Sequence, residues 1–368
     1  MKTGRQGIFV VLMVALAVPA LAATRTVDCN AGKTITQALS AATPGDTLRV
    51  KGTCEETVSI TKDDITLDGR GTAVIDGQGA SQVVITVDGA RRVTVKALTV
   101  RNGFRGLLAT RGAAVLLQNL TAEDNASDGI QIDESATAQL TDCTAQRNGK
   151  NSGRDGIRVF RAGSATLNGS IISSDNGRYG INLSLGATVF VGLGARVTAS
   201  DNVDTGILVN GHSVFFLGSE GGTLITEDNG GRGIVAQENS SLNVYGGTVT
   251  IRRNAAGGLQ ALRNAFVRLQ STGLVALVAQ INNNGGNGVE VNQDASVRFD
   301  QGTTIQNNTA RGIWLLGGSH GNLTHIVVRN NGDDGIEAQD TSLQLTDSTL
   351  TGIRETLICL CTLARESS

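Results

Sequence analysis

The segment "EDNASDGIQID" (residues 123–133) contains an Asn, three further residues, a Gly-Ile pair and then alternating polar and apolar residues. The same pattern returns as "SDNGRYGINLS" (174–184) and as "RNNGDDGIEAQ" (329–339). Its glycines follow one another at intervals of 23 to 30 residues: Gly106, Gly129, Gly156, Gly180, Gly206, Gly233, Gly258, Gly288, Gly312 and Gly335. A period near 25 that is kept through most of a 368-residue chain predicts a solenoid of stacked, similar units.

Each repeat glycine is followed by alternating apolar residues, such as Ile130 and Ile132, which is typical of a strand with one buried face. Two further short alternating runs follow in the same unit, which leaves no room for a helix. The pattern therefore predicts an all-β fold, a parallel β-helix with three short strands in each coil. Cys143 falls at the inward position that Leu120 occupies one coil earlier. We expect it to be a buried free thiol that packs as a small hydrophobe.

An Asn lies four residues before nine of the ten repeat glycines: Asn102, Asn125, Asn176, Asn202, Asn229, Asn254, Asn284, Asn308 and Asn331. In the tenth unit Asn148 lies eight residues before Gly156, as after an insertion of four residues. We expect each glycine to take a positive φ at a corner where a Cβ would clash. Asn tolerates the left-handed region and bonds nearby backbone, so the stacked Asn side chains are expected to form a ladder.

The N-terminus indicates an exported protein. Lys2 and Arg5 precede an apolar run, and the small residues around Ala22 are typical of a signal-peptide cleavage site, so residues 1–23 are predicted to be a signal. Its removal would shift the formal net charge from −2 to −4, which gives no general argument for nucleic-acid binding. We expect a secreted, periplasmic or cell-surface monomer without a membrane span after cleavage.

The mature N-terminus is predicted to cap the solenoid. Ile35, Ala38, Leu39 and Ala42 fall on one face of a short helix that would cover the apolar end of the stack. Cys29 and Cys54 are expected to form a disulfide in an oxidising compartment, because no His or second Cys pair lies nearby to make a metal site. The sequence therefore predicts a cap at residues 24–57, the β-helix at 58–351 and an irregular tail at 352–368.

The segments "PGDT" (44–47), "GTCEETVSI" (52–60) and "ITLDG" (65–69), together with the predicted cap helix, resemble the opening of right-handed parallel β-helix proteins of the pectin-lyase-like superfamily. The resemblance covers residues 26–351. It implies right-handed coils. It says little about activity, because this fold hosts lyases, hydrolases, epimerases, adhesins and inert spines. Many members of that superfamily act on acidic polysaccharides, so the resemblance implies a polysaccharide partner.

Equivalent residues of successive coils should form columns on the surface. The densest polar cluster falls on the coils between Gly129 and Gly206 and contains Asp128, Asp133, Asp155, Arg158, Arg178, Tyr179, Asn182 and Asn210. Asp128 and Asp155 should lie one coil apart, within roughly 5 Å. The predicted catalytic residues are Asp128, Asp155, Arg158 and Tyr179. The predicted substrate-binding residues are Asp133, Arg178, Asn182, Asn210 and Trp314.

Several chemistries fit two carboxylates at that distance, because one pKa must rise or a cation must lie between them. They could form the acid/base pair of a glycoside hydrolase or bind calcium. In a polysaccharide lyase, Tyr179 or an arginine could be the base while Arg158 and Arg178 neutralise a uronate. A purely structural explanation competes, since Asp is a common turn residue beside Gly. Three histidines, His212, His320 and His325, show no metal-ligand spacing.

The segments "SDGIQI" (127–132) and "RDGIRV" (154–159) also resemble the paired aspartate coils of polygalacturonases. The Gly-His-Gly and Arg-Ile-Lys elements of that family are absent from the expected coils. Two hypotheses therefore stay open for an exported β-helix that binds or cleaves polysaccharide. One is a lyase or hydrolase acting on uronate-containing glycans. The other, slightly favoured by the regular coils, is a non-catalytic adhesin or envelope protein.

Overall fold

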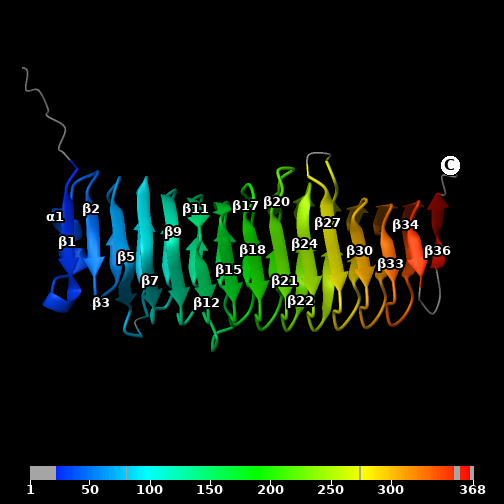
Figure 1. The fold of residues 1–368 in the computed structure, drawn as a ribbon, viewed down its shortest axis with the longest axis horizontal. Helices are drawn as coiled ribbons and strands as arrows, with labels where there is room; N and C mark the ends of the chain where they lie inside the picture. The colour runs from blue at the N-terminus through cyan, green and yellow to red at the C-terminus, as the bar shows by residue number, and fades with distance from the viewer. Residues whose placement is uncertain (1–21, 80, 273–274, 352–356, 365–368) are drawn as a thin grey trace, which may run out of the picture.

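A computed structural model describes residues 22–79, 81–272, 275–351 and 357–364, the last segment by its backbone alone. Figure 1 shows an elongated stack of coils that runs from the N-terminal helix at one end to the C-terminal strands at the other. Every strand pairing between coils is parallel, for example Ile130 with Leu107 on one side and Ile157 on the other. The predicted parallel β-helix is confirmed. The predicted signal peptide, apart from its last two residues, lies outside the described residues.

Three parallel sheets run along the stack. The first sheet, which follows the repeat glycines, contains β4 (Val58–Ile60), β6 (Ile85–Asp88), β8 (Leu107–Thr110), β10 (Ile130–Ile132), β13 (Ile157–Phe160), β16 (Ile181–Ser184), β19 (Ile207–Val209), β22 (Arg232–Gln237), β25 (Gly257–Leu262), β28 (Val289–Asn292), β31 (Ile313–Leu316), β34 (Ile336–Thr346) and β36 (Leu357–Ala364). The second sheet contains β1 (Thr24–Asp28), β2 (Thr47–Lys51), β5 (Thr66–Asp76), β7 (Val93–Arg101), β9 (Ala114–Glu123), β11 (Thr137–Thr141), β14 (Ser164–Asn168), β17 (Thr188–Val191), β20 (Val214–Leu217), β23 (Ser241–Val244), β26 (Phe266–Leu269), β29 (Ser296–Phe299), β32 (His320–Thr324) and part of β34. The third sheet contains β3 (Thr53–Glu55), parts of β5, β7 and β9, and β12 (Thr144–Gln146), β15 (Ser170–Ser174), β18 (Arg196–Ser200), β21 (Thr223–Glu227), β24 (Gly247–Arg252), β27 (Leu277–Asn282), β30 (Thr303–Gln306), β33 (Val327–Arg329) and β35 (Thr349–Thr351).

The core is a continuous column of aliphatic side chains inside the coils. Inward residues of successive coils, such as Ile130, Ile157 and Ile181, are fully buried and stack on one another. Cys143 belongs to this column as predicted, and burial raises the pKa of its thiol to about 11. A thiol with that pKa is almost entirely uncharged at neutral pH, so it packs as a hydrophobe.

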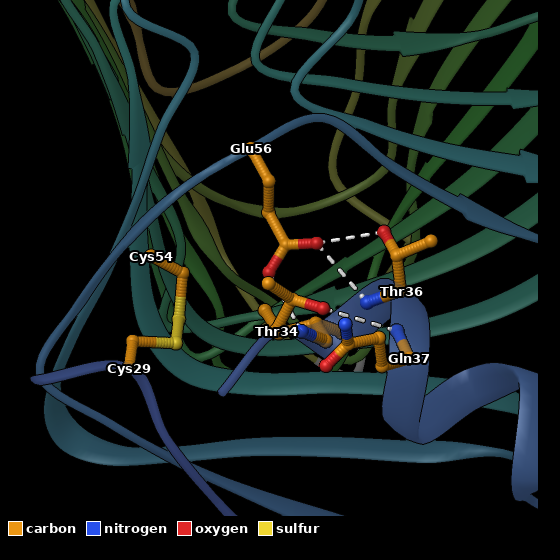
Figure 2. The surroundings of a disulfide bond; sticks show 7 residues. Cys29, Thr34, Thr36, Gln37, Cys54 and Glu56 are labelled. Carbon is orange, nitrogen blue, oxygen red and sulfur yellow. Dashed lines mark hydrogen bonds between the residues drawn. A yellow bond between two sulfur atoms is a disulfide. The ribbon is translucent and has the colours of Figure 1, made fainter. Parts of the chain in front are cut away.

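The N-terminal cap is confirmed. Helix α1 (Ile35–Ala41) lies at the end of the stack, follows the short 3₁₀ helix η1 (Cys29–Ala31), and buries Ile35 and Leu39. Figure 2 shows the Cys29–Cys54 disulfide, which joins η1 to β3, beside the start of α1. The predicted disulfide is therefore present.

The predicted asparagine ladder lines the turn between the third and the first sheet. The side-chain amide of each ladder Asn donates to the Oδ1 atom of the next one, at 2.9 Å from Asn125 to Asn148 and 3.2 Å from Asn148 to Asn176. The ladder continues with the same bond at 2.9–3.0 Å through Asn202, Asn229, Asn254, Asn284, Asn308 and Asn331. Asn148 completes the series, so the insertion follows it and leaves the ladder intact.

Two details of the predicted turn are wrong. Asn102 is not a ladder residue: it donates to Asp76, and the backbone N–H of Gly103 binds Asn125 in its place. The repeat glycines also do not take positive φ; the residue before each ladder Asn does, as at Asp124 with φ +54°. Gly129 is needed for space, because a Cβ there would lie 2.6 Å from the amide nitrogen of Asn148.

The C-terminal segment differs from the predicted irregular tail. Leu357–Ala364 forms β36, which pairs in parallel with β34 and shifts register between Gln339 and Ser342. The segment lacks the Asn and Gly signals of the repeat, but its run of apolar and β-branched residues favours a strand that satisfies the open edge of the last coil. Within the described residues, no helix is long and apolar enough to cross a membrane.

Candidate functional site

The candidate site lies on the outward face of the first sheet, where β10, β13 and β16 stack. Asp128 precedes β10 and Asp155 precedes β13, and both side chains are fully buried. The backbone N–H of Asp155 donates to Oδ1 of Asp128 at 3.1 Å, which places the two residues in contact across neighbouring coils. A ligand at the surface therefore meets the side chains that cover these carboxylates before it meets the carboxylates.

Asp155 is fully engaged. Both of its oxygens accept from the guanidinium of Arg178, at 2.8 and 2.9 Å, and Oδ2 also accepts from the amide of Asn182 at 2.7 Å. The hydrogen bonds to Asp155 raise the pKa of Arg178 above its usual value. A buried, two-pronged pair of this kind fixes the position of the guanidinium.

Asp128 is held differently. Its Oδ2 atom is buried and accepts no hydrogen bond; the nearest cations are Arg105, with Nε at 3.5 Å, and Arg158, with Nη1 at 3.7 Å. Burial raises the pKa of Asp128, and the neighbouring charge of Asp155 raises it further. Two arginines thus share the Asp128 carboxyl group and a third pairs with Asp155, so three guanidinium groups face two carboxyl groups at this point.

Each of three arginines also stacks on an aromatic ring that lies one or two residues from it in the chain. The guanidinium carbon lies 4.7 Å from the ring centre of Phe104 for Arg105, 4.1 Å from Phe160 for Arg158, and 4.6 Å from Tyr179 for Arg178. We call Arg105, Arg158 and Arg178 the arginine row. Their side chains are 25%, 16% and 30% exposed, so the row forms the surface above the buried aspartates. The rings and the carboxyl groups together restrict how the guanidinium groups can move.

Asp133 and Asn182 support the edge of the row. Asp133 accepts from Gln131 and from both Nε and Nη2 of Arg161. Burial alone would raise the pKa of Asp133, but the hydrogen bonds from Arg161 hold it below its usual value. Asn182 accepts from Ser184 while it donates to Asp155. Four of the five predicted substrate-binding residues thus occur on neighbouring coils, although Asp133 and Asn182 are themselves buried.

Two of the predicted residues lie away from this network. Asn210 is on the coil after Ser184, and its buried Oδ1 atom has no hydrogen-bond partner. Trp314 is on β31, five coils beyond Asn182 and so about 24 Å along the stack, where Arg311 stacks on it at 4.9 Å. Trp314 therefore belongs to a different part of the surface.

The backbone N–H of Tyr179, on the next coil, donates to Oδ1 of Asp155 at 3.4 Å. Burial raises the pKa of its phenol, and the nearby charge of Asp204 raises it further. A raised pKa disfavours the phenolate that a tyrosine base requires at neutral pH. The catalytic role predicted for Tyr179 stays a prediction, and the ring that it offers to Arg178 is the contact that the structure provides.

The sequence reasoning missed two features near the site. Arg105 occupies the same column as Asp128, and only its contact with that residue shows that it completes the row. The insertion after Asn148 also lines a depression of about 640 Å³, together with Asp76, Asn102 and Asp124. Its signal in the sequence is the broken spacing before Gly156, which gives no indication of which way the inserted residues project.

Metal binding finds limited support among these side chains. Within the described residues, the group of potential ligands that lies close together is Cys29, Cys54 and Glu56. Its sulfur atoms are joined in the disulfide and cannot act as thiolates. At the candidate site, Arg178 already takes up both oxygens of Asp155, which is the role that a calcium ion would otherwise have.

Comparison with protein-family models gives a match over residues 54–213 and 270–353 to the right-handed β-helix region. The chain belongs to the right-handed β-helix family. This confirms the handedness that the sequence resemblance implied. A comparison with curated protein sequences gave no match.

Solved structures with the right-handed β-helix include the A-module of a mannuronan C-5 epimerase of Azotobacter vinelandii. It is 18% identical, covers 90% of this chain and 94% of its own, and superposes with a TM-score of 0.60. A second A-module of the same kind and organism is 15% identical over 88% and 84%, with a TM-score of 0.45. The catalytic unit of an α-1,3-glucanase of Streptomyces thermodiastaticus is 12% identical over 93% and 70%, with a TM-score of 0.47. At these identities the likeness concerns the fold.

Proposed function

We propose that the protein binds an acidic polysaccharide through the arginine row, outside the cell or at its surface. The observation that carries the proposal is the contact of Asp128 and Asp155 with three guanidinium groups on one outward face. Three guanidinium groups face two carboxyl groups there, and their side chains are 16% to 30% exposed. Guanidinium groups match carboxylates in shape and charge, so a uronate could pair with the exposed edges of the row.

Two further observations support the ligand class and the location. The epimerase that shares the fold is named for mannuronan, a uronate polysaccharide, which makes polymannuronate the first ligand to test. The Cys29–Cys54 disulfide is typical of proteins in oxidising compartments, in agreement with the predicted signal peptide.

Retention on immobilised polymannuronate, compared with a neutral glucan, tests this function. We expect Arg158→Gln to weaken binding about tenfold, because one charge-assisted pair is lost. Gln131 occupies the same register one coil earlier, so the substituted side chain suits the sheet. Arg329→Gln is a matched control, since Gln306 precedes Arg329 in the third sheet. Equal retention on both glycans, or equal losses in both variants, would contradict the proposal.

A second candidate, acid/base catalysis on the same glycan, is favoured by Asp128. Its Oδ2 atom has no hydrogen-bond partner and its raised pKa favours the protonated form that a general acid requires. A substrate would have to displace the covering arginines to reach it. Incubation with uronate polymers, followed by the absorbance of unsaturated products and by reducing ends, tests for lyase and hydrolase activity. Turnover that survives in both Asp128→Asn and Asp155→Ala would remove these residues from the chemistry.

A further inference from the structure

A second cluster lies on a different face, the outward side of the second sheet. Phe190 on β17 and Phe216 on β20 are register partners, with ring centres 5.8 Å apart in an edge-to-face arrangement. Tyr245, which follows β23, continues the contact at 5.5 Å from Phe216. Phe266 and Arg268 on β26 complete the cluster. We call these five residues the aromatic row; it crosses the successive strands β17, β20, β23 and β26 of the second sheet, of which Figure 1 labels β17 and β20.

Arg268 gives the aromatic row a positive end. Its guanidinium carbon lies 5.0 Å from the ring centre of Phe266 and 5.4 Å from that of Tyr245, and Nη1 donates to the Tyr245 hydroxyl at 2.5 Å. Across the described part of the chain, Arg268 has no ion pair with a carboxylate, and its buried Nε atom lacks a hydrogen-bond partner. The next coil differs, because Arg298 lies 3.5 Å from Asp300. The row therefore ends in a cation that has no carboxylate partner among the described residues.

The second sheet does not need these rings in order to stack. Thr166 precedes Phe190 in the same register, and Asn243 lies between Phe216 and Arg268. Short polar side chains thus fill the same column in neighbouring coils. Phe190 is nevertheless 43% exposed, and the adjoining turn leaves Leu193 73% exposed. Such apolar exposure, at one end of a row of rings that leads to Arg268 three coils further on, suits a binding surface.

We propose that the aromatic row is a second glycan-binding site, which takes a carboxylated polysaccharide chain along the solenoid axis. Sugar rings have apolar C–H faces that pack against aromatic rings, and Arg268 would pair with a uronate carboxylate. The row is one residue wide, so its surface is too small to supply the roughly 800 Å² that each partner buries in a stable protein interface. One cation is also too few for the polybasic clusters that bind acidic membranes. The site lies on another sheet from the arginine row and does not rest on it.

Calorimetric titration with oligomannuronate and oligogalacturonate tests the site, with a neutral glucan oligomer as reference. Phe190→Thr and Arg268→Asn introduce residues that the same column already contains, so both should fold. We expect each to weaken binding of the acidic oligomers about fivefold to tenfold. Arg298→Asn, one coil further, should stay within about twofold. Unchanged affinity in both Phe190→Thr and Arg268→Asn would overturn the proposal.

A measurement on the unaltered protein makes the test independent of the variants. Phenylglyoxal labels accessible arginines, and mass spectrometry reports the extent at each residue. The acidic oligomer should protect Arg268 but not Arg329, which lies on the third sheet. Labelling of Arg268 at the same rate with and without the oligomer would also overturn the proposal. Loss of the arginine row in Arg158→Gln leaves this protection in place, so the two sites can fail separately.

Discussion

At the residue scale, the repeated Asn and Gly do two different jobs in one turn. The side chain of each ladder Asn accepts from the backbone and side-chain N–H groups of the ladder Asn one coil earlier, and it donates to a backbone carbonyl of that coil and to the Oδ1 atom of the ladder Asn one coil later, as at Asn202. Each repeat Gly leaves room for that amide, as the 2.6 Å approach of a Cβ at residue 129 to Asn148 shows. The strained left-handed position falls on Asp124 and its equivalents, which lie outside the most regular letters of the motif.

Asn202→Ala tests the ladder. The Asn202 side chain accepts from the backbone and side chain of Asn176 and donates to Ser173 and Asn229. Its removal leaves several buried groups unpaired, so we expect the free energy of unfolding to fall by about 3 kcal/mol in chemical denaturation. Asn151→Ala, at an exposed position of the insertion, is the control and should change stability by less than about 0.5 kcal/mol. Equal changes in the free energy of unfolding of the two variants would show that the ladder does not stabilise the fold.

Asp128→Asn tests the electrostatics of the buried pair. The folded-state pKa of Asp128 is raised, so the folded protein keeps this proton above the pH at which the unfolded chain loses it. Its contribution to stability is therefore complete below about pH 4 and is lost as the pH rises through the folded-state pKa. An uncharged amide does not titrate. Between pH 4 and pH 7 we therefore expect the denaturation midpoint of the parent to fall relative to that of the variant.

Asp133→Asn should behave in the opposite way and is the control for Asp128→Asn. Arg161 holds the pKa of Asp133 below its usual value, so this carboxylate stabilises the fold above about pH 4 and loses that effect as the pH falls. The variant should therefore lose most stability at pH 7 and less at pH 3. Matching pH profiles for the two variants would contradict the environments described for these aspartates.

At the scale of elements, α1 is stabilised by a negative side chain at its N-terminal end and a positive side chain at its C-terminal end, the signs that the helix dipole favours. The Glu56 carboxylate accepts from the backbone N–H groups of Ile35 and Thr36 at 2.6 and 3.0 Å, and Thr34 caps Gln37 (Figure 2). At the other end, the Lys62 ammonium donates to the carbonyls of Leu39, Ser40 and Ala42. Both side chains come from outside the helix, which is why a seven-residue helix with no charge of its own is stable here.

Glu56→Gln tests this arrangement. The amide keeps one acceptor and loses the charge, so we expect α1 to be destabilised by about 1 kcal/mol. Hydrogen exchange at Thr36 and the following amides should accelerate several-fold, while exchange in β13 and β16 stays unchanged. Glu55→Gln is the matched control, because Glu55 is exposed and lies one residue away. Faster exchange in both variants would point to a general loosening of the N-terminus.

The elements also show what the sequence could predict. Alternation after each glycine located the first sheet, and the apolar face of residues 35–42 located the helix, because both signals are local. The contacts of Glu56 and Lys62 could not be predicted from the sequence, because they join residues 20 to 23 positions apart. The directions of those side chains depend on the turns between them. The arginine row was partly visible, because stacking places Asp128 beside Asp155. The burial of the two aspartates could not be predicted, because it depends on how far the side chains of Arg105 and Arg158 fold over them.

At the scale of the whole molecule, the repeat means that stability is the sum of interactions between neighbouring coils. Each coil contacts the one before and the one after through parallel pairing in three sheets. Such a stack can unfold from an end without disturbing its centre. The aromatic row lies on central coils, and the arginine row begins before β8, two coils beyond β4, so both should persist when the outermost coils open.

The double variant Cys29→Ser, Cys54→Ser tests this independence. The disulfide closes a loop with a sequence separation of 25, so its loss should cost the N-terminal coils about 3 kcal/mol. We expect hydrogen exchange to accelerate over residues 24–55, because η1 and β3 are no longer joined beneath α1. The ladder amides from Asn202 to Asn331 should stay as protected as in the parent, and polymannuronate binding should be unchanged. Uniform acceleration along the chain would instead mean that the solenoid unfolds as one cooperative unit, in which the cap limits the stability of every coil.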